Sequence, residues 1–555
     1  MQKIIECVPN FSEGKSKSII DEILSEIKSE SQVELLDSDM GADTNRTVVT
    51  FVGSPENVIN AAFKAISKAS QIIDMSKHHG THSRIGATDV CPIIPVKNVT
   101  MEECVEFAKR LGERVGNELK IPVYLYEKAA TSPDRVNLAT IRAGEYEGLE
   151  QKLKDPKWKP DYGEPIFNPR AGATIIAYNV NLNTKDLAIG RDIIFDLREY
   201  GRAKRDDKGE IIRDDNGKAL TIPGRLKAVK GGVWYVEKYQ RCQITMNLVN
   251  FHITSMHQAV DEIEIEAHKR GCRVTGSEII GVVPLEAILE AGLHYLKKQG
   301  KSQGVSEEDI VECAIQSLGL SDVVPFDPKE KIIEYKLAQS KSGNQWMNKP
   351  IRTFMNDLSS DSFLGGGSVS ALLGALSSSL FTMVANLTVG KKGYEKNWEK
   401  MNEIAIQGQK FKDWFLEQID EDISAFNQVI SSRRLPQKTD SEKEKRKKEV
   451  EQATKNAVLV PFSVLKKASE IVDFIAVALE NGNVNALSDC GVSAMCLYSA
   501  SWGVYYNILI NIQYIDDSVW VNDIKPQADD LLKSLEEKVF KIQKDCKTKL
   551  EKKEN

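Results

Sequence analysis

The sequence lacks the cysteine patterns of disulfide-rich and zinc-binding domains. Its nine cysteines are scattered over 555 residues and form no CxxC pair, which favours reduced thiols. The N-terminal stretch MQKIIECVPNFSEG has no apolar run of signal-peptide length. We therefore expect a cytoplasmic protein.

Histidine is scarce, and so is an excess of charge of either sign. All seven histidines precede Tyr295, so acid–base catalysis in the last third would need carboxylates, lysines, cysteines, tyrosines or bound water. A net charge of -6 is small for this length, and the 28% of charged residues is ordinary. Neither value indicates nucleic acid as a partner.

Two long runs carry no charged residue, residues 363–390 and 490–515. Each is long enough to span a membrane. The first is rich in Ser, Ala and Gly, and the second contains Asn507, Asn511 and Gln513. This composition favours closely packed helices buried in a bundle or an oligomer over membrane spans.

Apolar periodicity predicts an α/β protein followed by helices. We expect two similar α/β subdomains at 1–178 and 179–335, a polar linker at 336–350, and an all-α helical-bundle domain at 351–555. The residues 203–223 form a polar excursion with a turn signal at Asn216 and Gly217. The predicted strands are 33–39, 46–53, 90–96, 174–183 and 242–253, and the predicted helices of the α/β part are 57–73, 186–201 and 255–271.

The stretch KHHGTHSRIGATDVCP, residues 77–92, holds three of the seven histidines. His78 and His82 have the i, i+4 spacing of a metal pair on a helix, but Gly80 interrupts the helix and no third ligand is evident. A histidine in a glycine-containing loop beside Arg84 suits proton transfer. A structural or surface cluster is the other interpretation, and the residues alone leave it open.

Eight motifs stand out along the first 335 residues. They are CVPNFSEG (7–14), LLDSDMGADTNRTVVTFVG (35–53), IDMSKHHGTHSRIGATDVCPIIPV (73–96), YLYEKAA (124–130), IRAGEYEGL (141–149), GRLKAVKGGVWY (224–235), GSEIIGVVPLEAIL (276–289) and PFDPKEKIIEY (325–335). With these motifs the first part of the chain resembles glutamate formiminotransferase. This resemblance implies transfer of a formimino group from N-formimino-L-glutamate to tetrahydrofolate, without a metal.

Four further motifs lie in the last third of the chain: GGGSVSALLGAL (365–376), DEDISAF (420–426), RLPQKTDSEKEKR (434–446) and GNVNALSDCGVSA (482–494). With these motifs the last third resembles formiminotetrahydrofolate cyclodeaminase, which closes the formimino product to 5,10-methenyltetrahydrofolate and releases ammonia. Both parts in this order resemble the bifunctional formiminotransferase-cyclodeaminase family of histidine degradation.

The transferase resemblance places the catalytic base at His82. Asp39 is the candidate to orient it, with a turn residue as the alternative, and Arg46 is the candidate to bind a substrate carboxylate, with a surface or interdomain ion pair as the alternative.

The resemblance also places folate contacts in residues 163–172 and 224–233, where plain turns are the alternative. After Thr174 the chain is shorter than the family pattern and lacks an arginine there, so a protein active only as a cyclodeaminase is a competing interpretation. The candidate contacts are Gly163, Phe167, Gly172, Gly224, Arg225, Lys227 and Gly231.

In the helical part the resemblance assigns catalysis to Asp422, which would otherwise belong to an acidic surface patch. Asp420, Glu421 and Asp422 are consecutive, so on a helix they point in different directions. The candidate folate contacts here are Gly365, Gly366, Gly367, Ser368 and Asp489. For the first four of these, a plain helix start is the alternative.

The lysine-rich residues 442–455 form a solvated helix face or hold a polyglutamate tail of folate. A non-catalytic folate-binding protein is the competing hypothesis from another class. We expect small-molecule substrates, no metal, no nucleic acid partner, no membrane span, and a homo-oligomer.

Overall fold

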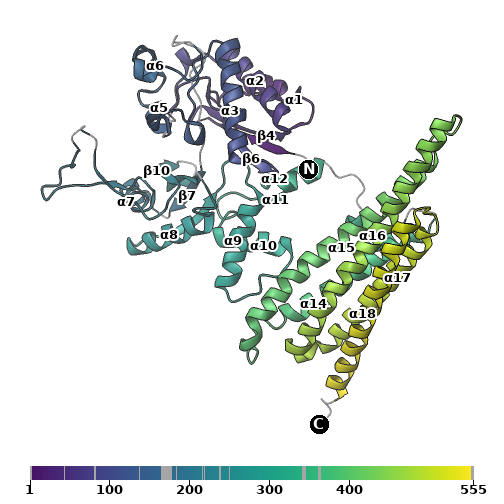
Figure 1. Ribbon diagram of the computed structural model, residues 1–555. Coiled ribbons are helices and arrows are strands. Elements are labelled where there is room, and N and C mark those ends of the chain that lie inside the picture. The colour runs from purple at the N-terminus through teal and green to yellow at the C-terminus, as the bar shows by residue number, and fades with distance from the viewer. Residues whose placement is uncertain are drawn as a thin grey trace. The chain divides into compact units, whose positions relative to one another are not determined.

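The computed structural model describes residues 3–551 except 43, 81–82, 137, 164–177, 183, 215–216, 218, 237–238, 249, 341–345 and 361–363 (Figure 1). The chain divides into two compact units, Met1–Ala291 with Ala314–Lys341 and Gly292–Cys313 with Ser342–Asn555. The division passes through α9 (Leu285–Lys298) and α10 (Glu307–Leu318).

The first unit begins with an antiparallel sheet in the order β5-β2-β4-β1-β6, with β3 on the other edge of β4. Pro9 separates β1 from β2, and Pro92 separates β5 from β6, because proline cannot donate to a strand ladder. The single strand predicted at 90–96 is therefore wrong, whereas the strand at 46–53 is confirmed. The strands are β1 (Ile4–Cys7), β2 (Asn10–Phe11), β3 (Val33–Gly41), β4 (Arg46–Gly53), β5 (Thr88–Val90) and β6 (Ile93–Lys97).

Both faces of this sheet are covered by helices. Phe51 of β4 packs in the core that α1 and α2 share, whereas its neighbour Val52 packs with Ile333 of α12. Successive strand residues point to opposite faces, so these two clusters lie on opposite sides of the sheet. The helices of this part are α1 (Lys17–Lys28), α2 (Pro55–Ile72), α3 (Met101–Glu118), α4 (Pro133–Val136), α5 (Leu138–Arg142), α6 (Glu145–Lys154), α11 (Pro328–Lys331) and α12 (Ile333–Ser340).

A second antiparallel sheet in the same unit has the order β10-β11-β7-β12. The polar excursion forms the small hairpin of β8 (Arg202–Ala203) and β9 (Thr221–Ile222), whose predicted turn residue Asn216 lies outside the described residues. The predicted α/β class is confirmed. The elements are β7 (Tyr178–Leu182), β10 (Val229–Val236), β11 (Arg241–Leu248), β12 (Val274–Glu278), α7 (Leu187–Leu197) and α8 (Met256–Lys269).

The second unit is a bundle of long helices, as predicted (Figure 1). Glycines on α14 bring neighbouring helices close: a side chain on Gly374 would overlap Phe415 of α15. The Ser377 and Ser493 hydroxyls lie 3.0 Å apart between α14 and α17. The helices are α13 (Ile351–Leu358), α14 (Gly366–Asn386), α15 (Trp398–Arg433), α16 (Asp440–Asn481), α17 (Leu487–Ile512) and α18 (Ser518–Glu551).

Within the described part of the chain, α14 alone is long and apolar enough to cross a membrane, and 61% of its apolar window is buried. The small residues Ser370, Gly374 and Ser378 are among those that other helices cover. This is the packing of a bundle core helix, as the composition of residues 363–390 predicts.

Candidate functional site

The histidine-rich stretch follows the short helix η1 (Met75–Lys77), and its first histidine is buried. Nε2 of His78 lies 2.7 Å from the carbonyl oxygen of Asn45, and Nδ1 accepts a 3.1 Å hydrogen bond from Nε–H of Arg84. Because arginine only donates, the His78 proton is assigned to Nε2. Burial lowers the pKa of His78. The structure therefore holds this histidine neutral and uses it to order the loop.

Asn45 anchors the same loop from the hairpin between β3 and β4. Its side-chain oxygen accepts a 3.0 Å hydrogen bond from the Gly14 N–H, and its amide donates across 3.0 Å to the His79 carbonyl. A side chain on Gly80 would overlap the hairpin backbone. The hairpin thus fixes the backbone of the loop as far as Gly80.

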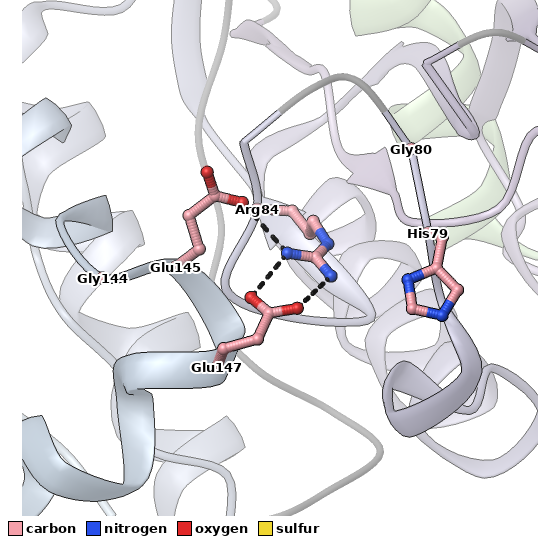
Figure 2. A pocket seen from close by; sticks show the side chains of 6 residues that line it. All are labelled: His79, Gly80, Arg84, Gly144, Glu145 and Glu147. Carbon is pink, nitrogen blue, oxygen red and sulfur yellow. Dashed lines mark hydrogen bonds and ion pairs between the residues drawn. The ribbon is translucent and has the colours of Figure 1, made fainter.

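Arg84 connects this loop to the start of α6. Its Nη1 donates to Glu145 across 3.0 Å, and its Nη2 donates to Glu147 across 2.7 Å (Figure 2). The hydrogen bond to Glu147 is the main cause that raises the pKa of Arg84, and the same bond lowers the pKa of Glu147. Arg84 is only 6% exposed, whereas the side chains of Glu145 and Glu147 are 44% and 62% exposed, so water reaches the carboxylate side of this ion-pair fork.

These side chains line an open pocket of about 540 Å³ (Figure 2). His82 lies outside the described residues. Gly80 and Arg84, two positions before and two positions after His82 in the sequence, both contribute to the pocket. The lining residues are His79, Gly80, Arg84, Gly144, Glu145 and Glu147.

The candidate substrate residues Asp39 and Arg46 lie on the neighbouring strands β3 and β4. Asp39 is exposed and lies within electrostatic reach of Tyr239. Burial lowers the pKa of Arg46 to about 10, and the nearby Asp89 opposes this shift. Asp89 is 1% exposed and accepts a hydrogen bond from Arg142. Arg46 therefore belongs to a buried charged cluster.

Sequence reasoning named Arg46 and Arg84 but missed their partners in this cluster and in the ion-pair fork. Asp89, Arg142, Glu145 and Glu147 all stand in the motifs ATDV and IRAGEYEG, so they lay within stretches that had already been singled out. Each partner is more than 50 residues away in the sequence: Arg84 and Glu145 are separated by 61 positions, and Arg142 and Asp89 by 53. Only the fold brings them together.

The described candidates for folate contact in the first unit pack against protein groups. A side chain on Gly224 would overlap the backbone at the end of α7, and one on Gly231 would overlap Ile194. Arg225 forms ion pairs with two carboxylates of α8, Glu262 at 2.9 Å and Glu266 at 2.7 Å. These glycines therefore have a packing explanation of their own.

The other candidates of this set divide between described and undescribed residues. Gly163 has a left-handed φ of 81° and lies against Ile121, and the Lys227 carbonyl accepts a 2.6 Å hydrogen bond from Thr254. Phe167, Gly172 and the shortened segment after Thr174 lie outside the described residues.

In the second unit, Asp422 of α15 meets the start of α14. The Ser368 hydroxyl donates to Oδ2 of Asp422 across 2.8 Å, and a side chain on Gly367 would overlap the same carboxyl group. Burial raises the pKa of Asp422, and the hydroxyl and backbone N–H of Ser368 oppose this rise. Gly365 is the N-cap residue, and Gly366 begins the helix. The structure therefore brings Asp422 together with the predicted glycine segment.

The neighbouring acidic residues point elsewhere, as predicted. Oδ1 of Asp420 accepts a 2.9 Å hydrogen bond from the backbone N–H of Trp346, and Glu421 is exposed. Asp420 and Trp346 also line a separate pocket of about 410 Å³. Only Asp422 of the three faces the start of α14.

Asp489 does not join this group within the bundle. It lies in the first turn of α17, whereas Asn507, near the other end of α17, is the residue next to Gly366. The 18 positions that separate Asp489 from Asn507 correspond to roughly 27 Å along a helix. Among the residues described, no group of three or more His, Cys, Asp or Glu side chains could hold a metal ion.

Three models of protein families match the chain in succession. "Formiminotransferase domain, N-terminal subdomain" matches residues 4–179, "Formiminotransferase domain" matches residues 177–338, and "Formiminotransferase-cyclodeaminase" matches residues 350–530. Together they cover both units.

Relatives with known names match either the whole chain or one part of it. A formimidoyltransferase-cyclodeaminase from Mus musculus is 39% identical over 94% of this chain and 94% of its own length. A glutamate formimidoyltransferase from Streptococcus pyogenes is 40% identical over 54% of this chain and 94% of its own length. A methenyltetrahydrofolate cyclohydrolase from Methylorubrum extorquens is 29% identical over 36% of this chain and 97% of its own length.

Proposed function

Because the chain belongs to the formiminotransferase-cyclodeaminase family, we propose that its two reactions are carried by His82 and Asp422. The enzyme transfers a formimino group from N-formimino-L-glutamate to tetrahydrofolate and then cyclises the product to 5,10-methenyltetrahydrofolate with release of ammonia. The observation that carries this function is the 39% identity to a bifunctional relative over 94% of both chains. The match spans both activities, so the cyclodeaminase-only and non-catalytic alternatives are not favoured.

In the first reaction, N5 of tetrahydrofolate attacks the formimino carbon. N5 loses a proton as its bond to carbon forms, and the glutamate nitrogen gains a proton as its bond to that carbon breaks. One imidazole, that of His82, serves both transfers. Anchoring of the chain on both sides of His82, through Gly80 and Arg84, supports this role because a catalytic base needs a fixed position.

Asp39 and Arg46 are the proposed substrate-side residues of this reaction. Asp39 is exposed on β3, as a residue that meets a ligand should be, and we propose that it stabilises the charged form of His82. We assign Arg46 to a substrate carboxylate. Its position beside Asp89 also supports the ion-pair alternative, and the effect of Arg46→Lys on the KM for formiminoglutamate discriminates between them.

In the second reaction, N10 attacks the formimino carbon and its proton passes to the terminal nitrogen, so that the carbon–nitrogen double bond becomes a single bond. The terminal nitrogen then takes up a second proton, its remaining bond to the carbon breaks, and it leaves as ammonia. Asp422 supplies that proton, and burial, which raises its pKa, keeps the carboxyl protonated to higher pH than an exposed aspartic acid. The absence of histidine after His294 leaves this carboxyl as the proposed acid.

The folate contacts remain proposals at Gly163, Phe167, Gly172, Gly224, Arg225, Lys227, Gly231, Gly365, Gly366, Gly367 and Ser368. We further propose that the folate is polyglutamylated and that the basic residues of α16, including Arg446 and Lys448, hold its tail. Mono- and polyglutamylated folates should then differ in how much formimino intermediate accumulates.

We infer a cytoplasmic homo-oligomer with the domain limits predicted above. Self-association is supported by exposed apolar side chains on α14 and α17, which include Leu376, Met383, Val492 and Met495. Sedimentation of the full chain tests this inference, and a monomer at assay concentration would contradict it.

A staged assay tests the two catalytic assignments. Tetrahydrofolate and formiminoglutamate are supplied together, while glutamate release, methenyltetrahydrofolate absorbance and ammonia are followed. His82→Ala should block glutamate release, and Asp422→Ala should release glutamate but accumulate the formimino intermediate. A wild-type protein that only cyclises supplied 5-formiminotetrahydrofolate would restore the cyclodeaminase-only alternative.

A further inference from the structure

Ser368 is the buried partner of the Asp422 carboxyl group. It is 0% exposed, its hydroxyl donates to Oδ2 across 2.8 Å, and its backbone N–H also donates to the carboxyl group. Two donors from one residue fix both the position and the rotation of a carboxyl group more tightly than one donor does.

The start of α14 is thereby already occupied by a carboxyl group from its own chain. Helix N-termini stabilise negative charge because their first N–H groups lack partners within the helix. Here the third residue of α14, Ser368, gives its N–H to Asp422, in the way a capping side chain would.

Gly367 gives Asp422 the space for this arrangement. A Cβ at Gly367 would overlap the Asp422 carboxyl group, with Oδ1 as its nearest atom. Oδ2 receives the Ser368 hydroxyl, so Oδ1 is the oxygen left to carry a proton when the carboxyl is neutral.

We propose that Ser368 is a positioning residue for the cyclodeaminase reaction, which holds the Asp422 carboxyl group so that Oδ1 carries the proton to the departing ammonia. This inference rests on the proposed role of Asp422. It gives Ser368 the role of holding the Asp422 carboxyl group, in addition to any contact with folate. In the transfer, the O–H bond at Oδ1 breaks, the new N–H bond forms, and the carboxylate that remains keeps both Ser368 donors.

The test is the pH profile of cyclisation with supplied 5-formiminotetrahydrofolate, which bypasses the first reaction. Ser368→Ala removes a donor that favours ionised Asp422, so the limb of the profile due to Asp422 should move to higher pH by about 1 unit. We expect kcat to fall about 10-fold with little change in KM.

Ser370 provides a matched control on the same helix. It is 2% exposed, and its hydroxyl donates to the Gly366 carbonyl across 2.7 Å instead of to a carboxyl group. Ser370→Ala removes an equally buried hydroxyl and should leave the profile in place. Ser368→Cys, which keeps the volume but donates weakly, should move the limb in the same direction as Ser368→Ala and covers the case in which the alanine variant does not fold.

The outcomes separate the two levels of the proposal. If Asp422→Asn keeps wild-type cyclisation, the assignment of Asp422 fails, and the role of Ser368 fails with it. If Asp422→Asn is inactive while folded Ser368→Ala or Ser368→Cys keeps the wild-type profile, the assignment of Asp422 stands and the inference on Ser368 is overturned. Equal shifts in the Ser368 and Ser370 variants would overturn it as well.

Discussion

Nε of Arg84 lies 3.1 Å from Nδ1 of His78, so a guanidinium donates to an imidazole that must remain unprotonated at that nitrogen. The other His78 nitrogen lies 2.7 Å from the Asn45 carbonyl. His78 holds the loop together, and a second proton on its ring would place two cationic donors against each other.

The first prediction is that His78 makes the stability of the first unit depend on pH. Burial lowers its pKa in the folded chain below the ordinary 6.5. As the pH falls through about 6.5 and below, the unfolded chain gains a proton that the folded chain resists, so the free energy of unfolding decreases. His78→Gln should flatten this dependence in urea unfolding followed between pH 5.5 and 7.5.

His268 on α8 serves as the control because it is exposed in the same unit. His268→Gln should retain the wild-type dependence. Identical slopes for His78→Gln and the wild type would mean that the neutral His78 contact does not contribute to the pH dependence.

The second prediction concerns the space beside Asp422. An alanine at Gly367 would raise helix propensity by about 1 kcal/mol, but its Cβ would overlap the carboxyl group. Gly367→Ala should therefore lower cyclisation at least about 10-fold while the helix content is retained. At Gly365, the N-cap residue of α14, a Cβ would meet open space, so Gly365→Ala should cost only the roughly 0.5–1 kcal/mol by which alanine is a poorer N-cap than glycine. Equal activities of Gly367→Ala and the wild type would show that Asp422 does not need this space.

Sequence patterns predict a helix or strand correctly where a single local signal determines it. The predicted strand at 46–53 coincides with β4, because alternating β-branched residues face two covered sides of the sheet. The uncharged run 363–390 contains α14. At residues 90–96 two local signals compete, since an apolar run favours a strand while Pro92 breaks the ladder, and the proline decides the outcome.

The site was less predictable because its contacts are not local. Ser368 and Asp422 are 54 positions apart, and nothing in either motif shows that one donates to the other. Asp489 was grouped with Asp422 by resemblance, but the pairing of Gly366 with Asn507 leaves Asp489 at the far end of α17. Helix direction in a bundle is set by packing, which a single sequence does not display.

The third prediction is that Glu6 makes the first unit less stable as the pH rises. It is 5% exposed on β1, and burial, with a smaller contribution from Glu334, raises its pKa from 4.5 to about 8. Between these two pH values the Glu6 carboxyl group has lost its proton in the unfolded chain and retains it in the folded chain. The stabilising contribution of Glu6 is therefore fully present below pH 4.5 and is lost progressively as the pH rises to about 8.

Glu6→Gln keeps the shape of the side chain without its ionisation. At pH 8 it should exceed the wild type in free energy of unfolding by roughly 1–3 kcal/mol, measured by urea unfolding, with the two curves converging near pH 5. Glu113→Gln, at an exposed position of the same unit, should follow the wild type throughout. A Glu6→Gln variant less stable than the wild type at pH 8 would contradict a buried proton at this site.

The fourth prediction uses two helical glycines with opposite surroundings. A Cβ at Gly408 of α15 would overlap the Thr382 side chain of α14, whereas a Cβ at Gly148 of α6 would meet nothing within 4 Å. Gly408→Ala overpacks a bundle interface and should destabilise the second unit by roughly 1–3 kcal/mol. Gly148→Ala gains only helix propensity and should stabilise the first unit by about 0.5–1 kcal/mol. Thermal unfolding of both variants measures the two effects, and stabilisation by Gly408→Ala would show that α14 and α15 do not pack as closely as these contacts require.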